Sequence, residues 1–528
     1  MTPEEAKNEL SNYRDKPFRE HQEEAVDFIL GSTQRFVFLC APTGSGKSLI
    51  AMTAGMASGS CTYAVHSKPL QNQITTDFPE AMSLFGRSNY PCLNSISDLS
   101  CDECSHTRNS PCSLKRTACK YELAKRNTLA HNLRILNYDY LLTEANYVGR
   151  FSDPLNGFNI IDEADNLENT LINFCSLTLT DYALKRLGMK EGMERLHKTG
   201  KDTVGLIASW VDFAQEARYS ANRIVSSYSK EIAQYPQILN DYQARTVKEL
   251  SRIKRLLESI NIFIDNVDPT WLMDSPQEGK YIFRPLWMTE DLADKFLWRH
   301  AKKWILMSAS FLPIKIESKR LGVPMDALEY KDLPSTFSAS RRPIFINGIA
   351  NLSAKTMEEE APKLTAEIKK IVDIHPDVKG LVHGVSYKLA NRIMDDVDSP
   401  RLITHNSKDR QEVLDRFISS PEPLVLVSPS MDRGVSFEQD LCRFIVVAKA
   451  PYLSLGDRVV AARLYSKGIG SQWYTATMLL TVLQMTGRGF RSADDYCENY
   501  ILDEQFSRAL LRRPSYLPEW WKEALIFS

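Results

Sequence analysis

The sequence predicts an α/β fold with two parallel-sheet domains and insertions between them. Three observations lead to this prediction. Short apolar runs alternate with helix-length stretches near the N-terminus and again beyond about residue 330, as in the crossover units of a parallel sheet. Residues 168–296 carry a mainly helical pattern instead. A glycine-rich turn follows the first apolar run, where a helix N-terminus can bind phosphate groups.

The composition is that of an ordinary globular protein. The 528 residues include 43% apolar and 25% charged residues, which excludes a disordered chain, a collagen-like fibre and a small disulfide scaffold. The net charge of −1 excludes an overall basic nucleic-acid coat but not a local basic patch. No apolar run approaches the roughly 18 residues of a membrane span. Because the start, MTPEEAKNEL, is unlike a signal peptide, we expect an intracellular, cytoplasmic protein that does not enter membranes.

The two sheets are predicted from apolar runs of strand length. In the first domain these are residues 36–40, 61–65 and 159–161. Further runs follow at 304–307, 343–346, 424–427 and 444–447. Between the two groups, apolar residues recur at steps of three and four, which predicts a helix packed within its own domain. They are Leu250, Ile253, Leu257, Ile260 and Ile264.

Residues 41–48, APTGSGKS, predict a phosphate-binding loop between a strand and a helix. Small residues let successive backbone N–H groups surround a polyphosphate, Lys47 adds a positive charge, and the Ser48 hydroxyl can bind Mg²⁺. Ala41 occupies the place of the usual first glycine. A methyl group is tolerated at this position if the φ angle is negative. The predicted nucleotide-binding residues of the loop are Pro42, Thr43, Gly44, Ser45, Gly46, Lys47 and Ser48.

Residues 160–165, IIDEAD, supply the acidic partner of this loop. A carboxylate at the end of an apolar strand can hold the Mg²⁺ that bridges the β- and γ-phosphates, which assigns Asp162 to the metal. Glu163 then suits the general base that polarises the attacking water. An acidic cluster alone is more often a helix cap, but together with the phosphate loop it predicts ATP hydrolysis with Mg²⁺.

Three polar residues near the C-terminus are spaced to share one helical face: Gln484, Arg488 and Arg491. Arginines supplied by a second domain would neutralise the charge that develops on the γ-phosphoryl group. We therefore predict that ATP lies between the two domains, in contact with Lys47 on one side and Arg488 and Arg491 on the other.

Seven segments in this order resemble the motifs of superfamily 2 helicases, in the iron–sulfur branch typified by XPD and DinG. They are FREHQEEA, APTGSGKS, HSKPLQNQI, IIDEADNLEN, ILMSASF, LVSPSMDRGVSFEQDLCRFIVVAKAPY and QMTGRGFRSADD. The resemblance implies that Arg19 and Gln22 bind the adenine side and that Gly434 contacts the nucleotide. Asp165 stands where this family usually has His, and Arg433 and Ser436 stand where it usually has acidic residues.

The resemblance implies two RecA-like domains with an iron–sulfur insertion and a helical arch. Helicase domain 1 would comprise residues 1–85, 136–167 and 297–328, with the iron–sulfur insertion at 86–135 and the arch at 168–296. Helicase domain 2 would comprise 329–528, with LVHGVSYKLANRI as a motif IV element.

The implied function is an ATP-dependent DNA helicase that moves 5′ to 3′ on single-stranded DNA and acts on forks, with repair or replication proteins as partners. One alternative is a nucleotide-gated DNA-binding or fork-recruitment subunit without productive unwinding. Another is a motor on RNA or RNA–DNA hybrids.

Five of the ten cysteines lie in one short window, which in a reduced compartment indicates a metal site rather than disulfides. Four thiolates suit zinc as well as iron, but the resemblance favours a [4Fe–4S] cluster. The resemblance implies Cys92, Cys112 and Cys119 as ligands. The fourth is Cys104, which we favour, or Cys101. If Cys101 and Cys104 were both ligands, as the spacing in archaeal members of the resembled branch implies, Cys112 would not be one.

Basic residues gather around the same window: Arg108, Lys115, Arg116, Lys120, Lys125, Arg126 and Arg134. They could neutralise the phosphates of a single strand, with Tyr121 stacking on a base, although a solvated charged surface is the simpler alternative.

Overall fold

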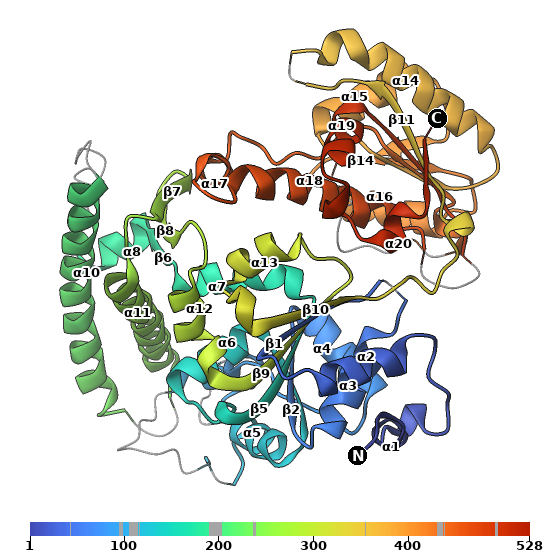
Figure 1. Cartoon of the computed structure of the whole chain (residues 1–528). Coiled ribbons are helices and arrows are strands. Elements are labelled where there is room, and N and C mark those ends of the chain that lie inside the picture. The colour runs from blue at the N-terminus through green and yellow to red at the C-terminus, as the bar shows by residue number, and fades with distance from the viewer. Residues whose placement is uncertain are drawn as a thin grey trace.

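The computed structural model describes the chain except for residues 43, 94–98, 105–113, 116, 190–202, 236–238, 354, 430–436, 438, 491–494 and 528. Two α/β lobes make up most of the molecule, with a helical segment beside the first (Figure 1). Within the described residues, no helix is both long and apolar enough to cross a bilayer.

The first lobe is built on a seven-stranded parallel sheet. Its spatial order is β10 (Leu328–Asp332), β1 (Phe36–Cys40), β9 (Ala301–Ser308), β5 (Asp153–Asp162), β2 (Cys61–Val65), β4 (Leu133–Asn137) and β3 (Met82–Ser83). Buried residues alternate between the two faces of the strands, so both faces pack against helices. One face packs on α2 (Gln22–Gly31), α3 (Lys47–Ala57) and α4 (Lys68–Asp77). The other packs on α6 (Tyr138–Tyr147), α7 (Leu167–Cys175) and α12 (Glu290–Phe296).

The second lobe repeats this architecture with another seven-stranded parallel sheet. The order is β13 (Leu402–Thr404), β14 (Val425–Ser428), β12 (Gly380–His383), β15 (Phe444–Val447), β16 (Glu498–Asp503), β11 (Ile344–Ala350) and β17 (Leu525–Phe527). One face packs on α14 (Met357–Ile374) and α15 (Tyr387–Asp396). The other packs on α16 (Arg410–Ser419), α18 (Gly470–Thr486), α19 (Glu504–Arg512) and α20 (Glu519–Lys522).

The segment beside the first lobe contains two long helices, α10 (Thr203–Ile232) and α11 (Asp241–Asn266), which lie side by side (Figure 1). The predicted apolar stripe packs inward from α11, where Ile253 and Ile260 are buried. The segment is not helical throughout. It also holds a three-stranded antiparallel sheet, β6 (Leu177–Thr180), β8 (Lys280–Pro285) and β7 (Trp271–Gln277), which the sequence analysis did not predict.

Five further helices complete the helical elements of the described chain. They are α1 (Pro3–Asn8), α5 (Lys120–Ala130), α8 (Asp181–Arg186), α13 (Ile314–Leu321) and α17 (Arg458–Tyr465). Short 3₁₀ turns lie at Ser11–Tyr13, Arg87–Asn89, Cys101–Glu103, Ala164–Asn166, Trp298–His300, Met325–Ala327, Ala339–Arg341, Gln439–Leu441 and Pro514–Tyr516.

The predicted α/β fold with two parallel sheets is confirmed. The runs at 36–40, 61–65 and 444–447 form strands with those bounds. The division between the lobes differs from the predicted boundary at 328, because β10 pairs with β1 in the first sheet. The backbone N–H of Leu333 still donates to the carbonyl of Cys40 at 2.9 Å. The first lobe therefore continues to about Leu333.

Candidate nucleotide site between the lobes

The phosphate loop lies where the sequence predicts it, between β1 and α3. Gly44 and Gly46 have φ values of +84° and +78°, a conformation that favours glycine. Gly46 directly precedes the first turn of α3, so the free N–H groups of that turn face the loop. The Nζ of Lys47 donates to the carbonyl of Ala41 at 3.2 Å. Pro42 and Ser45 close the loop through a 3.2 Å backbone hydrogen bond, while Thr43 lies outside the described residues.

Gln22 joins the predicted adenine-side segment to this loop. Its Nε2 donates to the carbonyl of Ser45 at 2.9 Å, and its Oε1 accepts from the backbone N–H of Arg19 at 2.9 Å. A Cβ at Gly46 would lie 2.3 Å from Gln22 Nε2, so only glycine allows this approach. The buried Gln22 thus fixes the loop, whereas Arg19 is exposed beside it.

Asp162 ends β5 opposite the loop and is almost fully buried. Its Oδ2 accepts from the Tyr63 hydroxyl at 2.6 Å, and its Oδ1 accepts from the backbone N–H of Glu163 at 2.9 Å. The side chain of Ser48 acts on the same hydroxyl, where it opposes the rise that burial causes in the pKa of Tyr63, so this one hydroxyl lies between the two predicted Mg²⁺ ligands. The Tyr138 hydroxyl donates to the backbone carbonyl of Asp162. Burial raises the pKa of Asp162, and the Lys47 charge and the Tyr63 hydrogen bond oppose that rise.

Glu163 has a φ of +56°, which is unusual for a residue with a side chain and turns the chain sharply after β5. Burial raises the pKa of the Glu163 carboxyl, and the charges of Asp162 and Asp165 raise it further. The charges of Lys47 and Arg488 oppose that rise. Because Lys47 belongs to the first lobe and Arg488 to the second, this carboxyl lies in the electrostatic field of both lobes.

Two serines at or just after the end of β9, Ser308 and Ser310, connect the acidic segment to the second lobe. Ser308 Oγ donates to Asp165 at 2.8 Å. Gln484 Nε2 of α18 donates to Ser310 Oγ at 3.4 Å across the seam. Asp165 therefore keeps a polar link to the end of β9, although it replaces the histidine usual in the resembled family.

The prediction that Gln484, Arg488 and Arg491 share one helical face is wrong. The helix α18 ends at Thr486, so Arg488 lies in the turn that follows it. Gly487 and Gly489 disfavour continuation of the helix, and a Cβ at Gly489 would lie 2.5 Å from Cys497 Sγ. Arg488 still lies at the seam, because its charge acts on Glu163 and on the buried His383 at the end of β12. Arg491 and Gly434 lie outside the described residues.

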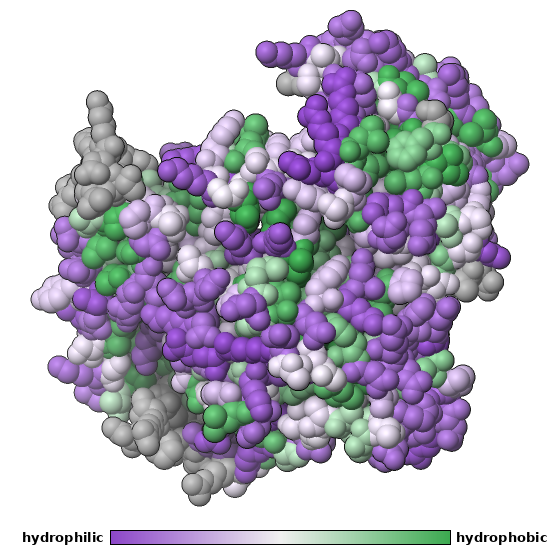
Figure 2. Space-filling model, in the orientation of Figure 1, coloured by the Kyte–Doolittle hydropathy of each residue, from purple (hydrophilic) through white to green (hydrophobic). Residues whose placement is uncertain are grey.

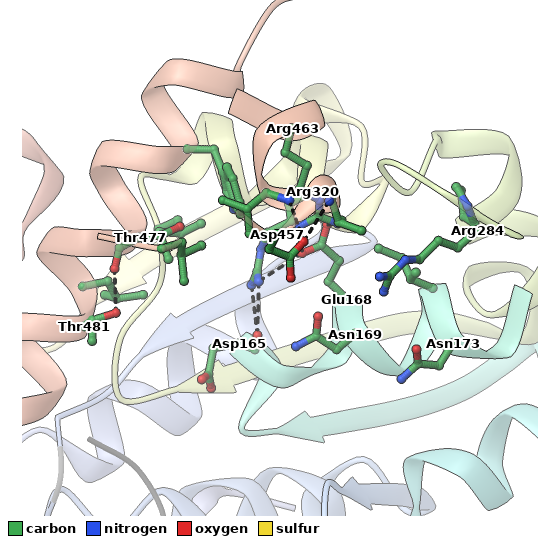
Figure 3. A pocket seen from close by; sticks show the side chains of 18 residues that line it. Asp165, Glu168, Asn169, Asn173, Arg284, Arg320, Asp457, Arg463, Thr477 and Thr481 are labelled. Carbon is green, nitrogen blue, oxygen red and sulfur yellow. Dashed lines mark hydrogen bonds and ion pairs between the residues drawn. The ribbon is translucent and has the colours of Figure 1, made fainter. Parts of the chain in front are cut away.

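A cavity of about 540 Å³ adjoins the acidic segment, where both lobes meet the base of the long-helix segment (Figure 3). At its centre Arg463 of α17 donates to both carboxylate oxygens of Glu168, at 2.9 and 3.2 Å. Arg320 also contacts Glu168, at 3.4 Å, and donates to the backbone carbonyl of Asp165. Arg463 packs against the rings of Trp287 and Trp473. This buried ion pair links the acidic segment directly to the second lobe.

The structure brings two cysteines of the predicted metal window, Cys101 and Cys119, close together, and the charge of Cys92 acts on Cys101 as well. Cys101 Sγ lies 3.9 Å from Cys119 Sγ, and the charges of Cys119 and Cys92 add to burial in raising the pKa of Cys101 to about 12. Backbone hydrogen bonds from Cys92 to Leu99 and from Cys101 to Tyr90 hold two of these residues on paired segments. Thiolates are the donors that zinc and iron–sulfur clusters take, so the type of these residues suits such a centre.

Only part of the predicted ligand set falls within the described residues. Cys112 lies outside them, and the distance between thiols that the structure gives is the one from Cys101 to Cys119. In the part of the chain that the structure describes, no three His, Cys, Asp or Glu side chains are grouped so that they could hold a metal ion.

The predicted strand contacts near the cysteines are wrong for Tyr121 and Lys125. Tyr121 is 6% exposed, and its hydroxyl hydrogen bonds with that of Tyr140 at 2.8 Å, so its ring cannot stack on a base. Lys125 is buried in an ion pair with Glu144 at 3.1 Å. Arg134 donates to Ser60 Oγ. Arg108 and Arg116 lie outside the described residues, which leaves Lys115, Lys120 and Arg126 as described members of the patch.

Sequence reasoning missed four residues of the site: Tyr63, Tyr138, His383 and Arg463. Each acts through a contact between segments far apart in the chain, which depends on strand register and lobe packing. A tyrosine inside an apolar strand carries no local signal of its distant partner. His383 alone had a local signal, because it lies in the segment LVHGVSYKLANRI, which the sequence analysis assigned to the second domain.

Comparisons with known proteins match both lobes to helicase domains. A DEAD/DEAH box helicase model matches residues 19–178, and a helicase C-terminal domain model matches residues 368–524. The ATP-dependent DNA helicase CHL1 of the yeast Vanderwaltozyma polyspora is 22% identical over 496 residues, covering 77% of this chain and 58% of that protein. The ATP-dependent DNA helicase YoaA of Escherichia coli K12 is 25% identical over 240 residues, covering 42% of this chain and 37% of that protein. The chain thus spans less than two thirds of the length of these relatives.

Two solved structures resemble the whole chain. One is S. tokodaii Xpd4, with a TM-score of 0.58 and 16% identity, covering 97% of this chain and 100% of that chain. The other is titled an XPD helicase, with a TM-score of 0.61, the same identity and the same coverage. At this identity the likeness concerns the fold, and it extends over both lobes and the segments inserted between them.

Proposed function

The chain belongs to the XPD/DinG-type helicases, and from this membership we propose that it is an ATP-dependent DNA helicase that moves 5′ to 3′ on single-stranded DNA. The observation that carries the proposal is the convergence of both lobes on Glu163. Lys47 reaches this carboxyl electrostatically from the first lobe, and Arg488 reaches it from the second. A protein that only bound DNA would need no such set of groups.

In this proposal each side chain at the seam has one task. Lys47 binds the outer phosphates, and Arg488, with Arg491, neutralises charge that develops on the γ-phosphoryl group. Glu163 takes the proton of the attacking water, which its raised pKa favours. Gln22 and Arg19 hold the adenine side, next to the loop that Gln22 already fixes. Ser48 and Asp162 would hold Mg²⁺, which supplies charge neutralisation between the β- and γ-phosphates when it is bound.

ATP binding would pull the lobes together because its phosphates contact residues of both, and hydrolysis would remove that bridge. If loops on each lobe hold the strand in turn, closing and opening move the protein along it. Forks are then the duplex substrate that we propose, and repair or replication proteins are the partners.

We also propose a [4Fe–4S] cluster at the cysteine window. Cys92, Cys101 and Cys119 are the first three ligands in this proposal, since Cys101 Sγ lies 3.9 Å from Cys119 Sγ and the charge of Cys92 acts on Cys101, with Cys112 or Cys104 as the fourth. When bound, the cluster would fasten a segment with few apolar side chains of its own. Iron and zinc content, with the visible absorption spectrum of protein purified without oxygen, tests this. A colourless protein that contains zinc would contradict it.

The substitution Lys47→Ala tests the motor. It removes the charge that binds the outer phosphates, so we expect loss of DNA-stimulated ATP hydrolysis and of strand separation on a forked duplex. Lys302→Ala is the matched control, because Lys302 is exposed near the start of β9, away from the loop. Strand separation that survives Lys47→Ala would contradict the proposal. Stronger stimulation of ATP hydrolysis by RNA than by DNA would move the motor to RNA or RNA–DNA hybrids.

A further inference from the structure

His383 is a buried polar residue for which the proposed reaction has no task so far. Figure 2 shows mainly hydrophilic side chains on the surface in view, whereas His383 is 1% exposed at the end of β12. Among the described residues, neither of its ring nitrogens has a hydrogen-bond partner. Because a buried polar group without a partner costs free energy, its presence calls for a physical explanation.

The neighbouring strands do not supply that partner. In the parallel sheet His383 is in register with Ser428 of β14 and with Val447 of β15. The Ser428 hydroxyl hydrogen bonds with Nε2 of the buried His405 at 2.7 Å, and Val447 is apolar. A partner for the His383 ring would therefore come from the elements that cover this end of the sheet.

The turn that carries Arg488 belongs to those elements. Leu381 and His383 point to the same face of β12, because side chains alternate along a strand. On that face Leu381 shares an apolar cluster with Met485, near the end of α18. The turn with Arg488 follows α18 directly, and the charge of Arg488 acts on the His383 ring.

The backbone of this turn is held firmly. A Cβ at Gly489 would lie 2.5 Å from Cys497 Sγ, and the backbone N–H of Phe437 donates to the carbonyl of Arg488 at 3.2 Å. These contacts fix where the Arg488 side chain starts, but an arginine has several rotatable bonds beyond that point. A hydrogen bond from the guanidinium to a fixed acceptor would define where its charge lies.

A neutral imidazole suits an arginine whose charge is needed elsewhere. The guanidinium has only N–H donors, and a neutral histidine has one ring nitrogen that accepts. Burial and the charge of Arg488 lower the pKa of His383 to about 3, so the ring is neutral near pH 7. A carboxylate in this place would form an ion pair and offset the positive charge, whereas the imidazole leaves that charge to the γ-phosphoryl group.

We propose that His383 is a positioning residue for Arg488: its ring nitrogen accepts a hydrogen bond from the guanidinium and directs the other N–H groups to the γ-phosphoryl group when ATP draws the lobes together. This inference rests on the proposed function and names the side chain that orients its arginine. His383 does not touch the nucleotide in this arrangement, so it acts only through Arg488.

The first test compares ATP hydrolysis by variants of the full chain at saturating single-stranded DNA. His383→Leu cannot accept a hydrogen bond, so kcat should fall by about ten-fold or more while KM for ATP changes little, since the arginine acts in the transition state. His383→Gln keeps an acceptor and should recover most of the lost rate. An equal loss of kcat in both variants, or an unchanged kcat in His383→Leu, would overturn the inference.

The matched control for this test is His375→Leu. His375 belongs to the same lobe and stacks on Phe444 at the start of β15, which is the edge of the parallel sheet opposite to the end of β12. This variant should keep the kcat of the unmodified chain. A loss of kcat as large as that of His383→Leu would mean that any change of a histidine in this lobe slows hydrolysis, which contradicts a specific role of His383.

Stability separates positioning from packing. Leucine fills the site without an unpartnered polar atom, so the urea midpoint of His383→Leu at pH 7 should equal or exceed that of the unmodified chain. Activity and stability would then change independently. A midpoint that falls together with kcat would assign His383 to packing and contradict the positioning role.

A double variant tests whether His383 acts through Arg488. Arg488→Ala removes the donor, so adding His383→Leu to it should change the rate by no more than about two-fold, measured in single turnovers with the protein in excess over ATP. A further loss in the double variant as large as that of His383→Leu alone would show that the two side chains act separately, which overturns the inference.

Failure of this inference and failure of the helicase proposal give different results. An unmodified chain without DNA-stimulated ATP hydrolysis contradicts both. An unmodified chain whose hydrolysis is abolished by Lys47→Ala, together with an unchanged kcat in His383→Leu, overturns only the role of His383.

Discussion

At the scale of single residues, the site depends on groups that hold others in place. Tyr63 is the clearest case, because its hydroxyl contacts both Asp162 and Ser48. Tyr138 contacts the same aspartate only at its backbone carbonyl. Substitutions of the two tyrosines can therefore be compared to distinguish orientation of the Asp162 carboxylate from packing of the ring.

Tyr63→Phe removes the donor that orients the Asp162 carboxylate. Loss of a group that orients a metal ligand typically lowers metal affinity or activity by 10–100-fold, so we expect the Mg²⁺ concentration for half-maximal ATP hydrolysis to rise by about ten-fold. A titration of the ATPase rate with MgCl₂ measures this. Tyr138→Phe, which leaves the carboxylate contacts intact, should require nearly the Mg²⁺ concentration of the unmodified chain. Equal shifts in both variants would show that Tyr63 acts by packing alone.

His383 predicts a pH dependence of stability. Burial, together with the charge of Arg488, lowers the pKa of this histidine from 6.5 to about 3. Neither ring nitrogen has a hydrogen-bond partner among the described residues. The unfolded chain binds a proton near pH 6.5 and the folded chain does not until about pH 3, so the free energy of unfolding falls as the pH drops through this interval.

At pH 5 the loss from His383 amounts to about 2 kcal/mol relative to pH 7. His383→Leu removes the titrating group, so urea unfolding of this variant should lose less stability between pH 7 and pH 5, by about that amount. His66→Ala replaces an exposed histidine and serves as the control. An unchanged pH dependence in His383→Leu would show that the folded chain accommodates the proton.

At the scale of elements, the turn after α18 positions Arg488 by close packing. A Cβ at Gly489 would lie 2.5 Å from Cys497 Sγ and 3.0 Å from the backbone carbonyl oxygen of Cys442. Gly489→Ala must displace this turn, so we expect a loss of about 1–3 kcal/mol of stability and slower ATP hydrolysis. At Gly487 the nearest atom would lie at 3.5 Å, so Gly487→Ala should change stability by less than about 0.5 kcal/mol. Thermal unfolding and ATPase rates of the two variants test this difference.

The same turn could not be predicted from the sequence. The phosphate loop, Asp162 and the buried strands could be predicted because their signals are local: a fixed spacing, or an apolar run between turn residues. The steps from Gln484 to Arg488 fit a helix equally well, but the contact of Gly489 with Cys497 brings together segments that no local pattern relates. The prediction that Tyr121 stacks on a base is wrong for the same reason, since its hydrogen-bond partner Tyr140 comes from another helix.

The antiparallel sheet of β6, β7 and β8 gave an even weaker signal. Its strand β6 is only four residues long and follows a helix directly. The apolar stripe of α11 dominates the sequence pattern of residues 168–296. The pattern therefore predicts helix for the whole segment, including the short strands near its two ends. Strand pairing between residues about 100 positions apart depends on tertiary contacts rather than on local preference.

At the scale of the whole molecule, two contacts between the lobes matter most among the described residues. One is the seam at Gln484 and Arg488, which ATP would bridge. The other is the buried pair of Arg463 and Glu168, next to apolar contacts of Leu312 with Trp473. Arg463 also donates to the carbonyl of Leu286, so it joins the second lobe to the base of the long-helix segment as well. The second contact needs no nucleotide and holds the lobes near each other between cycles.

Arg463→Ala should release this contact. Removing one partner of a buried ion pair typically costs about 3–5 kcal/mol, because the remaining charge is left without compensation. Here Arg320 still lies 3.4 Å from Glu168, so the first lobe stays folded and the cost falls on the contact between lobes. Small-angle X-ray scattering of the nucleotide-free variant should therefore show a larger radius of gyration. Arg458→Ala, on the exposed start of the same helix, is the matched control. Superimposable scattering curves of Arg463→Ala and the unmodified chain would mean that the apolar contacts alone hold the lobes together.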